Sequence, residues 1–185
     1  MSFKTWGSLV AILFLCGCGG GGGAPAAFSI SSSSYADNGV IPATNACQAL
    51  GGSDLSPQLT LRHLPSNAST IAILMDDEVA PCGTGADACV HWAVFNLPAS
   101  KTTFAEGESL GSISGVTYGQ TYDGNAAGYA GPCPPNDHIY KLTVFALNAD
   151  TPTIAQGTSL TRSTFASTYA ANIVGQSTWT GRYPN

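Results

Sequence analysis

Acidic, imidazole and phenol side chains stand next to three short apolar segments of this chain. Asp76 and Asp77 end the first segment, His91 begins the second, and His138 and Tyr140 lie at the start of the third. Where a carboxylate meets two histidines, it fixes the tautomer of an imidazole and raises its pKa, so that the ring becomes a donor for an anion. Polar groups gathered at strand ends are typical of a small preformed pocket. The pattern therefore predicts a pocket for a small anion.

The same residues also have a purely structural interpretation. Asp76-Asp77 can equally form a solvated turn with an Asx hydrogen bond, because acids that follow a strand often have only a structural role. His91 and His138 can each be a core histidine whose ring nitrogens bind neighbouring groups. The residue types alone leave both interpretations open.

A stiff segment precedes His138. Gly131-Pro132-Cys133-Pro134-Pro135 places three prolines around a cysteine, which predicts a loop of defined shape, with a cis peptide bond as one candidate source of that shape. Because the segment has no charged group, we expect it to form a wall of the pocket. Residues 111–131 are rich in Gly and Tyr and lack periodicity, as is typical of a long functional loop.

Strands must bring these groups together. Continuously apolar or alternating runs bounded by turn residues predict them, and the expected strands cover residues 28–32, 59–62, 71–75, 91–97, 139–147 and 177–183. One helix is expected over Leu160–Val174. Phe165, Tyr169 and Ile173 recur there every four residues, and Gly175 stands where a C-terminal cap belongs.

The composition excludes several classes of partner. Six Lys and Arg against eleven Asp and Glu give a net charge of −5, so the chain lacks the basic patch that nucleic acid or an anionic lipid surface requires. Charged residues make up only 9% of the chain, and glycines number 22. This mixture is typical of a β-rich exported protein rather than a helical bundle.

The first residues follow the pattern of an export signal. Lys4 precedes an apolar run that is too short to remain in a bilayer, and Leu15-Cys16-Gly17-Cys18 resembles a bacterial lipobox. We expect residues 1–17 to be a lipoprotein signal peptide, with Cys18 as the lipidated residue. The lack of Asp after Cys18 favours the periplasmic face of the outer membrane in the bacterial cell envelope. Plain secretion without a lipid is the alternative.

A glycine-rich tether is predicted over residues 18–27, followed by one domain over residues 28–185, which is long enough for a sizeable core.

Four cysteines remain for the domain, and four cysteines in an exported chain allow three disulfide pairings. Cys82 and Cys89 bracket a short loop tip, so we predict the pair Cys82–Cys89 and, by elimination, Cys47–Cys133. A zinc site is the alternative, but the spacings match no Cys-x-x-Cys knuckle. We expect no metal.

Five short motifs occur in a fixed order, and the set is a more specific signal than any single motif. In chain order they are Leu55-Ser56-Pro57-Gln58-Leu59, Asp76-Asp77-Glu78-Val79-Ala80-Pro81, His91-Trp92, Gly128-Tyr129-Ala130-Gly131-Pro132-Cys133-Pro134-Pro135 and His138-Ile139-Tyr140. This set resembles the phosphatidylethanolamine-binding protein (PEBP) family, and most closely its bacterial Raf-kinase-inhibitor-like branch. The resemblance covers about residues 28–183.

The resemblance implies a mainly β, antiparallel two-sheet fold with a C-terminal helix and few other helices. It also implies a pocket at the strand ends that takes phosphate, acetate or a phospholipid head group. Carried over one by one, the ligand-binding positions are Asp77, His91, Pro134, His138 and Tyr140. No cofactor is implied.

Three positions depart from the family's pattern. Glu78 stands where the family has Pro, Val79 where it has a second Asp, and Ile139 where it has Arg. Since an acid and a guanidinium are lost together, the local charge balance is unchanged. Arg is the stronger phosphate ligand, so we expect phosphate to bind weakly.

The leading functional hypothesis is a non-enzymatic, lipid-anchored extracytoplasmic binding protein with this small anion or head-group pocket. The alternative is a protein-interaction module that inhibits a protease or another extracytoplasmic enzyme, with the loop between Cys82 and Cys89 as its contact surface. A hydrolase is a third hypothesis, which we rank below both because the chain has no Gly-x-Ser-x-Gly motif and no evident activated nucleophile.

Overall fold

Two mainly antiparallel sheets form the domain in the computed structural model, which describes Met1 and residues 26–184. The larger sheet has six strands in the order β2 (Gly39–Val40), β9 (Ile173–Tyr183), β8 (His138–Leu147), β4 (Thr70–Asp77), β5 (Cys89–Pro98) and β7 (Thr117–Tyr118). The smaller sheet has the order β1 (Ser29–Ser31), β3 (Leu59–Arg62) and β6 (Thr103–Phe104). Only the pairing of β2 with β9 is parallel among these strands. The mainly β, two-sheet fold is therefore confirmed.

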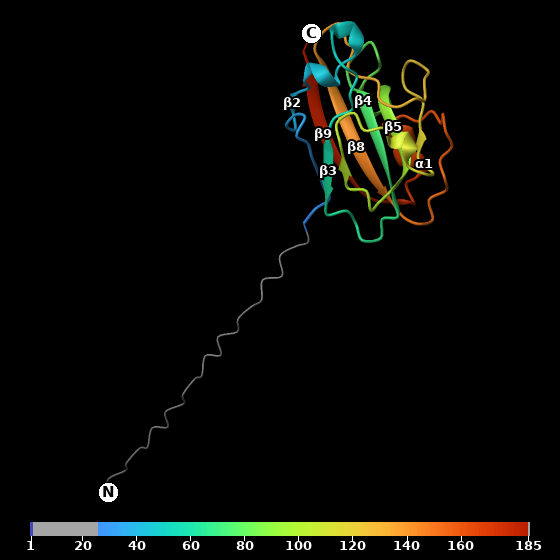
Figure 1. Cartoon of the computed structure of the whole chain (residues 1–185). Coiled ribbons are helices and arrows are strands. Elements are labelled where there is room, and N and C mark those ends of the chain that lie inside the picture. The colour runs from blue at the N-terminus through green and yellow to red at the C-terminus, as the bar shows by residue number, and fades with distance from the viewer. Residues whose placement is uncertain (2–25, 185) are drawn as a thin grey trace.

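The core has two parts, one on each face of the larger sheet. Figure 1 shows the long strands β9, β8, β4 and β5 next to one another, with β3 of the smaller sheet beside them. One apolar cluster fills the space between the two sheets, and it includes Leu59 and Leu61 of β3. The second cluster lies under the helix α1 (Arg162–Thr168), whose Phe165 stacks on Phe95 of β5. The large sheet is thus covered on both faces, which explains why β4 is almost continuously apolar.

The predicted helix over residues 160–174 is too long. Thr161 and Thr164 form a capping box at the start of α1, and the helix ends at Thr168 with Tyr169 as its C-terminal cap. Ile173 already belongs to β9, where it pairs with Leu147. The predicted cap Gly175 also lies in β9, and a Cβ atom there would approach Pro65 Cγ to 2.8 Å. Glycine is needed at that position because two segments pass closely.

The predicted strands all occur. The strand over residues 59–62 has the predicted limits, and the others differ. The expected strand over residues 71–75 extends to Asp77, and the short last strand of the prediction is the eleven-residue β9. Residues 111–131 are irregular apart from a 3-10 turn at Leu110–Ser112 and the two residues of β7. Further 3-10 turns cover Ala43–Asn45, Gln48–Leu50 and Gly85–Asp87.

Both predicted disulfides are present. Cys47 binds Cys133, and Cys82 binds Cys89. The cis peptide bond found among the described residues joins Ala80 to Pro81, so the expected candidate within residues 131–135 is wrong. The predicted signal peptide, the lipidated Cys18 and nearly all of the tether lie outside the described residues.

Candidate functional site

Three strand ends meet at one edge of the larger sheet. Because β4 is antiparallel to both neighbours, its last residue Asp77 pairs with Cys89 at the start of β5 and with Tyr140 near the start of β8. A cavity of about 120 Å³ lies at this edge. All five residues predicted to bind a ligand line it, namely Asp77, His91, Pro134, His138 and Tyr140.

Asp77 is the centre of this cavity's polar contacts. Its side chain is only 4% exposed, and its Oδ2 atom lies 2.6 Å from His138 Nδ1. The Asp77 Oδ1 atom accepts a hydrogen bond from the Val79 backbone N–H. That second contact is the Asx hydrogen bond of the structural interpretation, but the acid is buried, so the solvated turn is wrong.

His91 presents one ring nitrogen to Asp77. Its Nδ1 atom lies 2.9 Å from the Ala130 carbonyl oxygen, which can only accept, so Nδ1 carries a proton. The other nitrogen, Nε2, lies 4.0 Å from Asp77 Oδ2. Burial lowers the pKa of His91 and outweighs the Ala130 carbonyl and the Asp77 charge, which act in the opposite direction. Asp77 thus acts on the pKa of His91 in the expected direction, but burial is the larger effect and the net shift is downward.

Two further polar atoms at the cavity are buried without partners. His138 Nε2 and the Tyr140 hydroxyl make no hydrogen bond within the part of the chain that the structure describes. Burial, followed by the negative charge of Asp77, raises the pKa of the Tyr140 phenol well above its usual range, so the hydroxyl keeps its proton. Buried polar atoms are seldom left unpaired in native proteins, which makes these two atoms candidates for ligand contacts.

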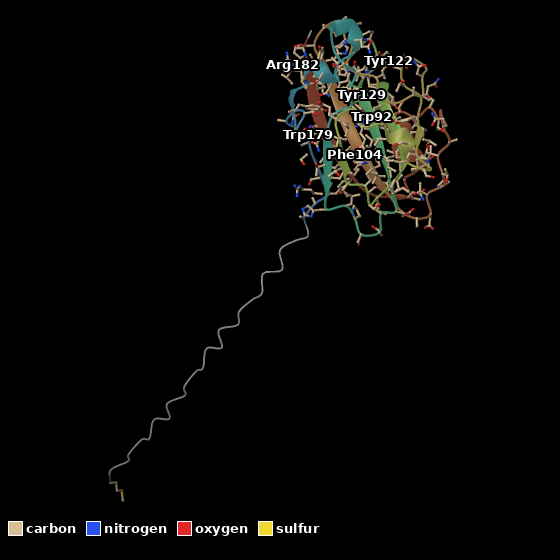
Figure 2. All side chains as sticks on the ribbon, in the orientation of Figure 1. Trp92, Phe104, Tyr122, Tyr129, Trp179 and Arg182 are labelled. Atoms are coloured by element: carbon tan, nitrogen blue, oxygen red, sulfur yellow. A yellow bond between two sulfur atoms is a disulfide. The ribbon has the colours of Figure 1, made fainter. Side chains whose placement is uncertain are left out.

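Tyr122 lines the cavity too, and sequence reasoning missed it. Its ring centroid lies 4.5 Å from that of His91, and 46% of the residue is exposed, so it stands at the mouth. Figure 2 labels Tyr122 at the upper end of the molecule, the end at which Figure 1 marks the C-terminus. The only signal for Tyr122 was its place in the Gly- and Tyr-rich segment of residues 111–131.

The remaining wall is rigid and uncharged. Pro81, Cys82, Cys133 and Pro135 complete the lining, and each cysteine belongs to a different disulfide. The wall segment is also held by hydrogen bonds, since the Cys47 N–H donates to the Pro132 carbonyl and the Gly131 N–H donates to Asp54 Oδ1. A Cβ atom at Gly131 would lie 2.6 Å from the Asn45 carbonyl oxygen, so only glycine permits this approach. The predicted role of residues 131–135 as a pocket wall matches their position.

The three departures from the family's pattern lie outside the cavity lining. Ile139 is 44% exposed, and Val79 contributes its backbone N–H to Asp77. Glu78 binds Lys141 and Arg162. No Lys or Arg is among the residues that line the cavity.

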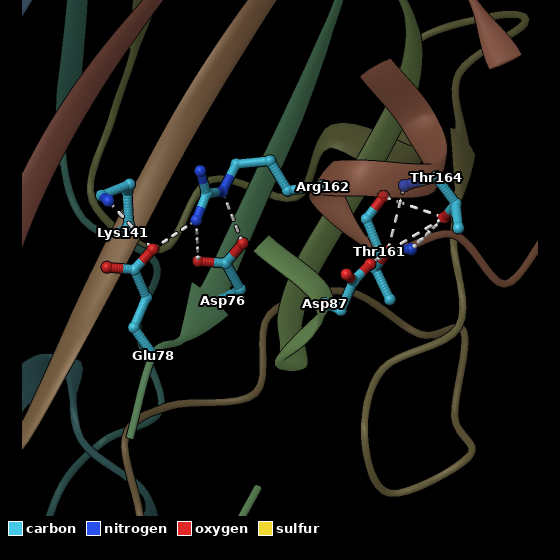
Figure 3. A network of polar contacts seen from close by, with 7 residues as sticks. All are labelled: Asp76, Glu78, Asp87, Lys141, Thr161, Arg162 and Thr164. Carbon is cyan, nitrogen blue, oxygen red and sulfur yellow. Dashed lines mark hydrogen bonds and ion pairs between the residues drawn. The ribbon is translucent and has the colours of Figure 1, made fainter. Parts of the chain in front are cut away.

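Asp76 points to the opposite face of the sheet, where an ion-pair network lies beside α1. Figure 3 shows Arg162 between the carboxylates of Asp76 and Glu78, with Lys141 on the far side of Glu78. The Arg162 Nε atom donates to Asp76 Oδ2 over 2.7 Å. Burial raises the pKa of Asp76 from its ordinary 3.8 to about 6, although Arg162 acts to lower it. Sequence reasoning missed this network, because its members are distant in the chain and no local pattern relates them.

Neither a metal-ligating cluster nor a membrane-spanning helix is found over Met1 and residues 26–184. No group of three or more His, Cys, Asp or Glu side chains there is placed to hold a metal ion. The four cysteines of the domain form the two disulfides, so none of them is available as a thiolate ligand for zinc. No helix in these residues is long and apolar enough to cross a membrane.

Solved structures with the same fold come from two bacteria. The structure of YbcL from E. coli, described as a new member of the mammalian PEBP family, has a TM-score of 0.72 and 23% identity, covering 86% of this chain and 99% of that one. The PEBP homologue CT736 from Chlamydia trachomatis has a TM-score of 0.70 and 24% identity, covering 86% and 98%. These likenesses establish the fold.

Sequence comparisons establish the relationship. A UPF0098 protein from Chlamydia pneumoniae is 31% identical over 157 residues, which cover 82% of this chain and 95% of that protein. A UPF0098 protein from Aquifex aeolicus is 31% identical over 134 residues, which cover 70% and 74%. The family model for the phosphatidylethanolamine-binding protein matches residues 31–184. With a match over most of its length, the chain belongs to the phosphatidylethanolamine-binding protein family.

Proposed function

We propose that this protein binds a small anion in the cavity at the end of β4, with protonated His91 as the positive partner. One observation carries the proposal: two buried polar atoms without partners, His138 Nε2 and the Tyr140 hydroxyl, belong to side chains of the same small cavity as His91, whose Nε2 atom lies 4.0 Å from Asp77 Oδ2. Ligand oxygens would supply the missing hydrogen bonds. Hydrogen bonds to a charged group are among the strong ones.

The charge balance makes this binding depend on pH. The cavity has the Asp77 carboxylate and no Lys or Arg, so an anion needs a proton on an imidazole. The pKa of His91 is lowered in the free protein, and a bound anion favours the charged ring and raises that pKa. Binding therefore takes up a proton, and affinity increases as the pH falls toward the pKa of free His91.

Binding without catalysis is favoured by the lining itself. It has no Ser, Thr or Lys, and its two cysteines are bound in disulfides. The lining therefore lacks the Ser or Thr hydroxyl, the free thiol and the amine that most often act as activated nucleophiles. The volume of about 120 Å³ is below the roughly 300–1,000 Å³ of pockets that take drug-sized ligands, so we infer a single phosphate, carboxylate or head group as the ligand.

The lipid anchor that we propose would hold the opposite end of the domain. Phe28 lies beside Gly175, and Gly175 pairs with Ala146 at the far end of β8 from His138. Ten residues of strand separate these ends, about 30 Å at the usual rise. In the lipid-anchored arrangement that we propose from the N-terminal sequence, the cavity thus opens away from the anchor, which favours a free extracytoplasmic anion over a head group of the same membrane.

Inhibition of an extracytoplasmic enzyme is the second candidate function. The loop closed by the Cys82–Cys89 disulfide is exposed at Gly83, Thr84, Gly85 and Asp87, and Cys82 itself lines the cavity. A stapled, exposed loop loses little conformational entropy when it docks on a partner. In that case, variants of Asp77 or His91 would leave inhibition intact.

Calorimetric titration of the chain beginning at Ala24, which keeps every described element, tests the anion proposal. Sulfate serves for the pH series because its own charge stays constant, and phosphate and phosphoethanolamine then compare a free anion with a head group. We expect saturable sulfate binding that tightens from pH 7.5 to pH 5.5, limited to about tenfold per pH unit for one proton. His91→Gln should abolish both the binding and the pH dependence.

His63→Asn is the matched control, because His63 is the exposed histidine and Asn accepts its positive φ of 56°. It should bind as the wild type does. Absence of heat with all three anions, in protein with a normal unfolding transition, would contradict the anion proposal. The loop of residues 82–89 would then be the site to test against partners.

A further inference from the structure

A second cavity lies on the other face of the larger sheet. Its volume is about 340 Å³, against about 120 Å³ for the cavity at Asp77. Residues of β8, β9 and α1 line it, together with Ala86 from the loop of residues 82–89. Figure 3 views this region, with Arg162 of α1 reaching over the sheet. Neither the anion pocket nor its ligand uses this space.

The floor of the second cavity has a buried hydroxyl without a partner. Thr143 of β8 is 1% exposed, lines the cavity, and its Oγ1 atom makes no hydrogen bond among the described residues. Thr178 of β9 lies directly opposite in the strand register and lines the same cavity. An unpaired buried hydroxyl lowers the stability of the folded state. Its presence in a cavity therefore points to a ligand that supplies the missing hydrogen bond.

The polar groups in the surrounding walls are uncharged, apart from Arg162. Ser163 and Ser167 line the cavity from α1, and Gln176 lines it from β9. Together with the two threonines they offer several hydroxyl groups and an amide, each able to donate and accept. No carboxylate is part of the lining.

Arg162 does not turn this cavity into an anion site. Its Nε atom binds Asp76, and its Nη2 atom binds Asp76 and Glu78. Lys141 neutralises the second acid by its own contact with Glu78. Both bases are therefore paired with acids, and no carboxylate belongs to the lining, so the lining has no unpaired charge to select an ion of either sign.

These features together define the ligand chemistry. An apolar ligand would leave the hydroxyl and amide groups unpaired, which is costly, and an ion would find no opposite charge. Phe145 and Ala166 supply apolar contacts within the same lining, as the C–H faces of a sugar ring require. The volume stands at the lower end of the roughly 300–1,000 Å³ range of ligand pockets, which suits a single ring better than an oligomer.

We propose that the cavity between α1 and strands β8 and β9 binds an uncharged polyhydroxylated ligand of sugar-ring size, with Thr143 Oγ1 as a hydrogen-bond partner. This site is separate from the anion pocket. It lies on the opposite face of the sheet, so the two sites are tested independently.

Nuclear magnetic resonance titration of the chain beginning at Ala24, with glucose and with N-acetylglucosamine, tests the proposal. At least one sugar should cause saturable shifts confined to Thr143, Arg162–Ser167 and Gln176–Thr178. Cyclohexanol has a ring of the same size with a single hydroxyl and should bind much more weakly. Shifts spread over the surface without saturation for both sugars, or equal binding of cyclohexanol, would overturn the proposal.

Thr143→Val separates a ligand contact from a structural role. The substitution keeps the shape and removes the unpaired hydroxyl, so the variant should unfold at a higher temperature than the wild type. Its sugar affinity should nevertheless fall about three- to tenfold, the loss of one hydrogen bond. Unchanged affinity in this folded variant would show that Thr143 takes no part. Thr180→Val, outside the cavity lining on the same strand as Thr178, is the control and should bind normally.

Ser167→Phe tests the position of the site. Ser167 is exposed on α1 and lines the cavity, so a phenyl ring there should block entry without disturbing the core. Sugar binding should be lost while sulfate binding at His91 persists. Sugar binding that survives Ser167→Phe would place the ligand elsewhere and refute the assignment.

Discussion

Asp76 and Asp77 are neighbours on one strand and have opposite environments. Alternation along β4 turns Asp76 toward α1 and Asp77 toward the cavity, and both are almost fully buried. Asp76 meets a guanidinium that is only partly exposed, within a network of two acids and two bases. Asp77 meets an imidazole and a backbone N–H, beside polar atoms without partners.

The difference separates a structural acid from a functional one. Around Asp76 the described charged groups are matched, so a ligand there would have to break existing ion pairs. Around Asp77 hydrogen-bonding capacity is left over, while two disulfides and several prolines hold the wall in place. Ion pairs thus stabilise the side of the sheet with Asp76. On the side with Asp77, disulfides and prolines hold the cavity wall in a fixed shape that is ready to bind a ligand.

The largest expected effect comes from the covalent side. Cys47–Cys133 closes a loop with a sequence separation of 86, and Cys82–Cys89 closes one of 7. On the chain-entropy estimate, the double variant Cys47→Ser/Cys133→Ser loses about 4–5 kcal/mol of unfolding free energy, and Cys82→Ser/Cys89→Ser about 2–3 kcal/mol. Urea denaturation under oxidising conditions measures both. Equal losses would show that native contacts of the wall, rather than loop closure, determine its stability.

Removing Arg162 should break the ion-pair side. Arg162→Ala leaves the Asp76 carboxylate, whose side chain is 0% exposed, without its guanidinium, so we expect a loss of about 3 kcal/mol in urea denaturation at pH 7. Arg182→Ala is the matched control, since Arg182 and Asp137 form an ion pair in which each side chain is 51% exposed. The control should lose less than about 1 kcal/mol. Similar losses in both variants would mean that burial adds nothing to the Asp76 pair.

The pH dependence of stability should distinguish Asp76 from other acids. Its pKa is raised to about 6 in the folded protein, from the ordinary value of 3.8, so the folded state binds the proton more tightly. Between these values stability then falls as the pH rises, by at most about 1.4 kcal/mol per pH unit, and the cost is complete above pH 6.

Asp76→Asn removes this titration, so the wild type should gain about 1 kcal/mol relative to the variant between pH 7 and pH 5. Urea denaturation at several pH values provides the difference. Asp150→Asn, at an exposed acid, is the control and should show no such gain. A constant difference between wild type and Asp76→Asn would contradict the raised pKa.

The strands and the site could be predicted because short runs of adjacent residues encode both of them. The burial of β8 alternates only over residues 138–141, and residues 142–147 are buried on both faces of the sheet. The site residues carry the family's motifs at strand ends. The helix was overextended because Phe165, Tyr169 and Ile173 do pack on the same apolar cluster. Ile173 reaches that cluster from the start of β9, and a fourfold spacing cannot show this change of element.

Contacts between distant segments could not be predicted, because sequence patterns relate only residues that are close in the chain. Arg162 and Asp76 are 86 residues apart, and no spacing rule links a helix start to an adjacent sheet face. The direction of the His91 pKa also depends on burial by segments far away in the chain. Local chemistry predicted which groups converge, but the balance between burial and charge followed only from the packed structure.

The smallest effect on stability should come from a substitution of Tyr122. This residue lies at the mouth of the cavity near Asp77, so it tests how exposure to water affects that side of the sheet. Tyr122 is 46% exposed, so Tyr122→Ala should change the unfolding free energy by less than about 0.5 kcal/mol. The ring covers His91 at 4.5 Å, and burial is the main cause of the lowered pKa of that histidine. Opening the mouth to water should therefore raise the pKa of His91 toward its usual value, as measured by the titration of its ring proton resonance.

The same change should move sulfate binding to higher pH, because less free energy is needed to protonate His91. Tyr122→Phe keeps the ring and removes only the hydroxyl, so its His91 titration should match that of the wild type. If Tyr122→Ala leaves the pKa of His91 unchanged, then burial of that imidazole comes from the β-sheet and the rigid wall alone. Tyr122 would then affect only the entry of the ligand. The pKa of His91 would be determined by the strands and the rigid wall that surround the imidazole.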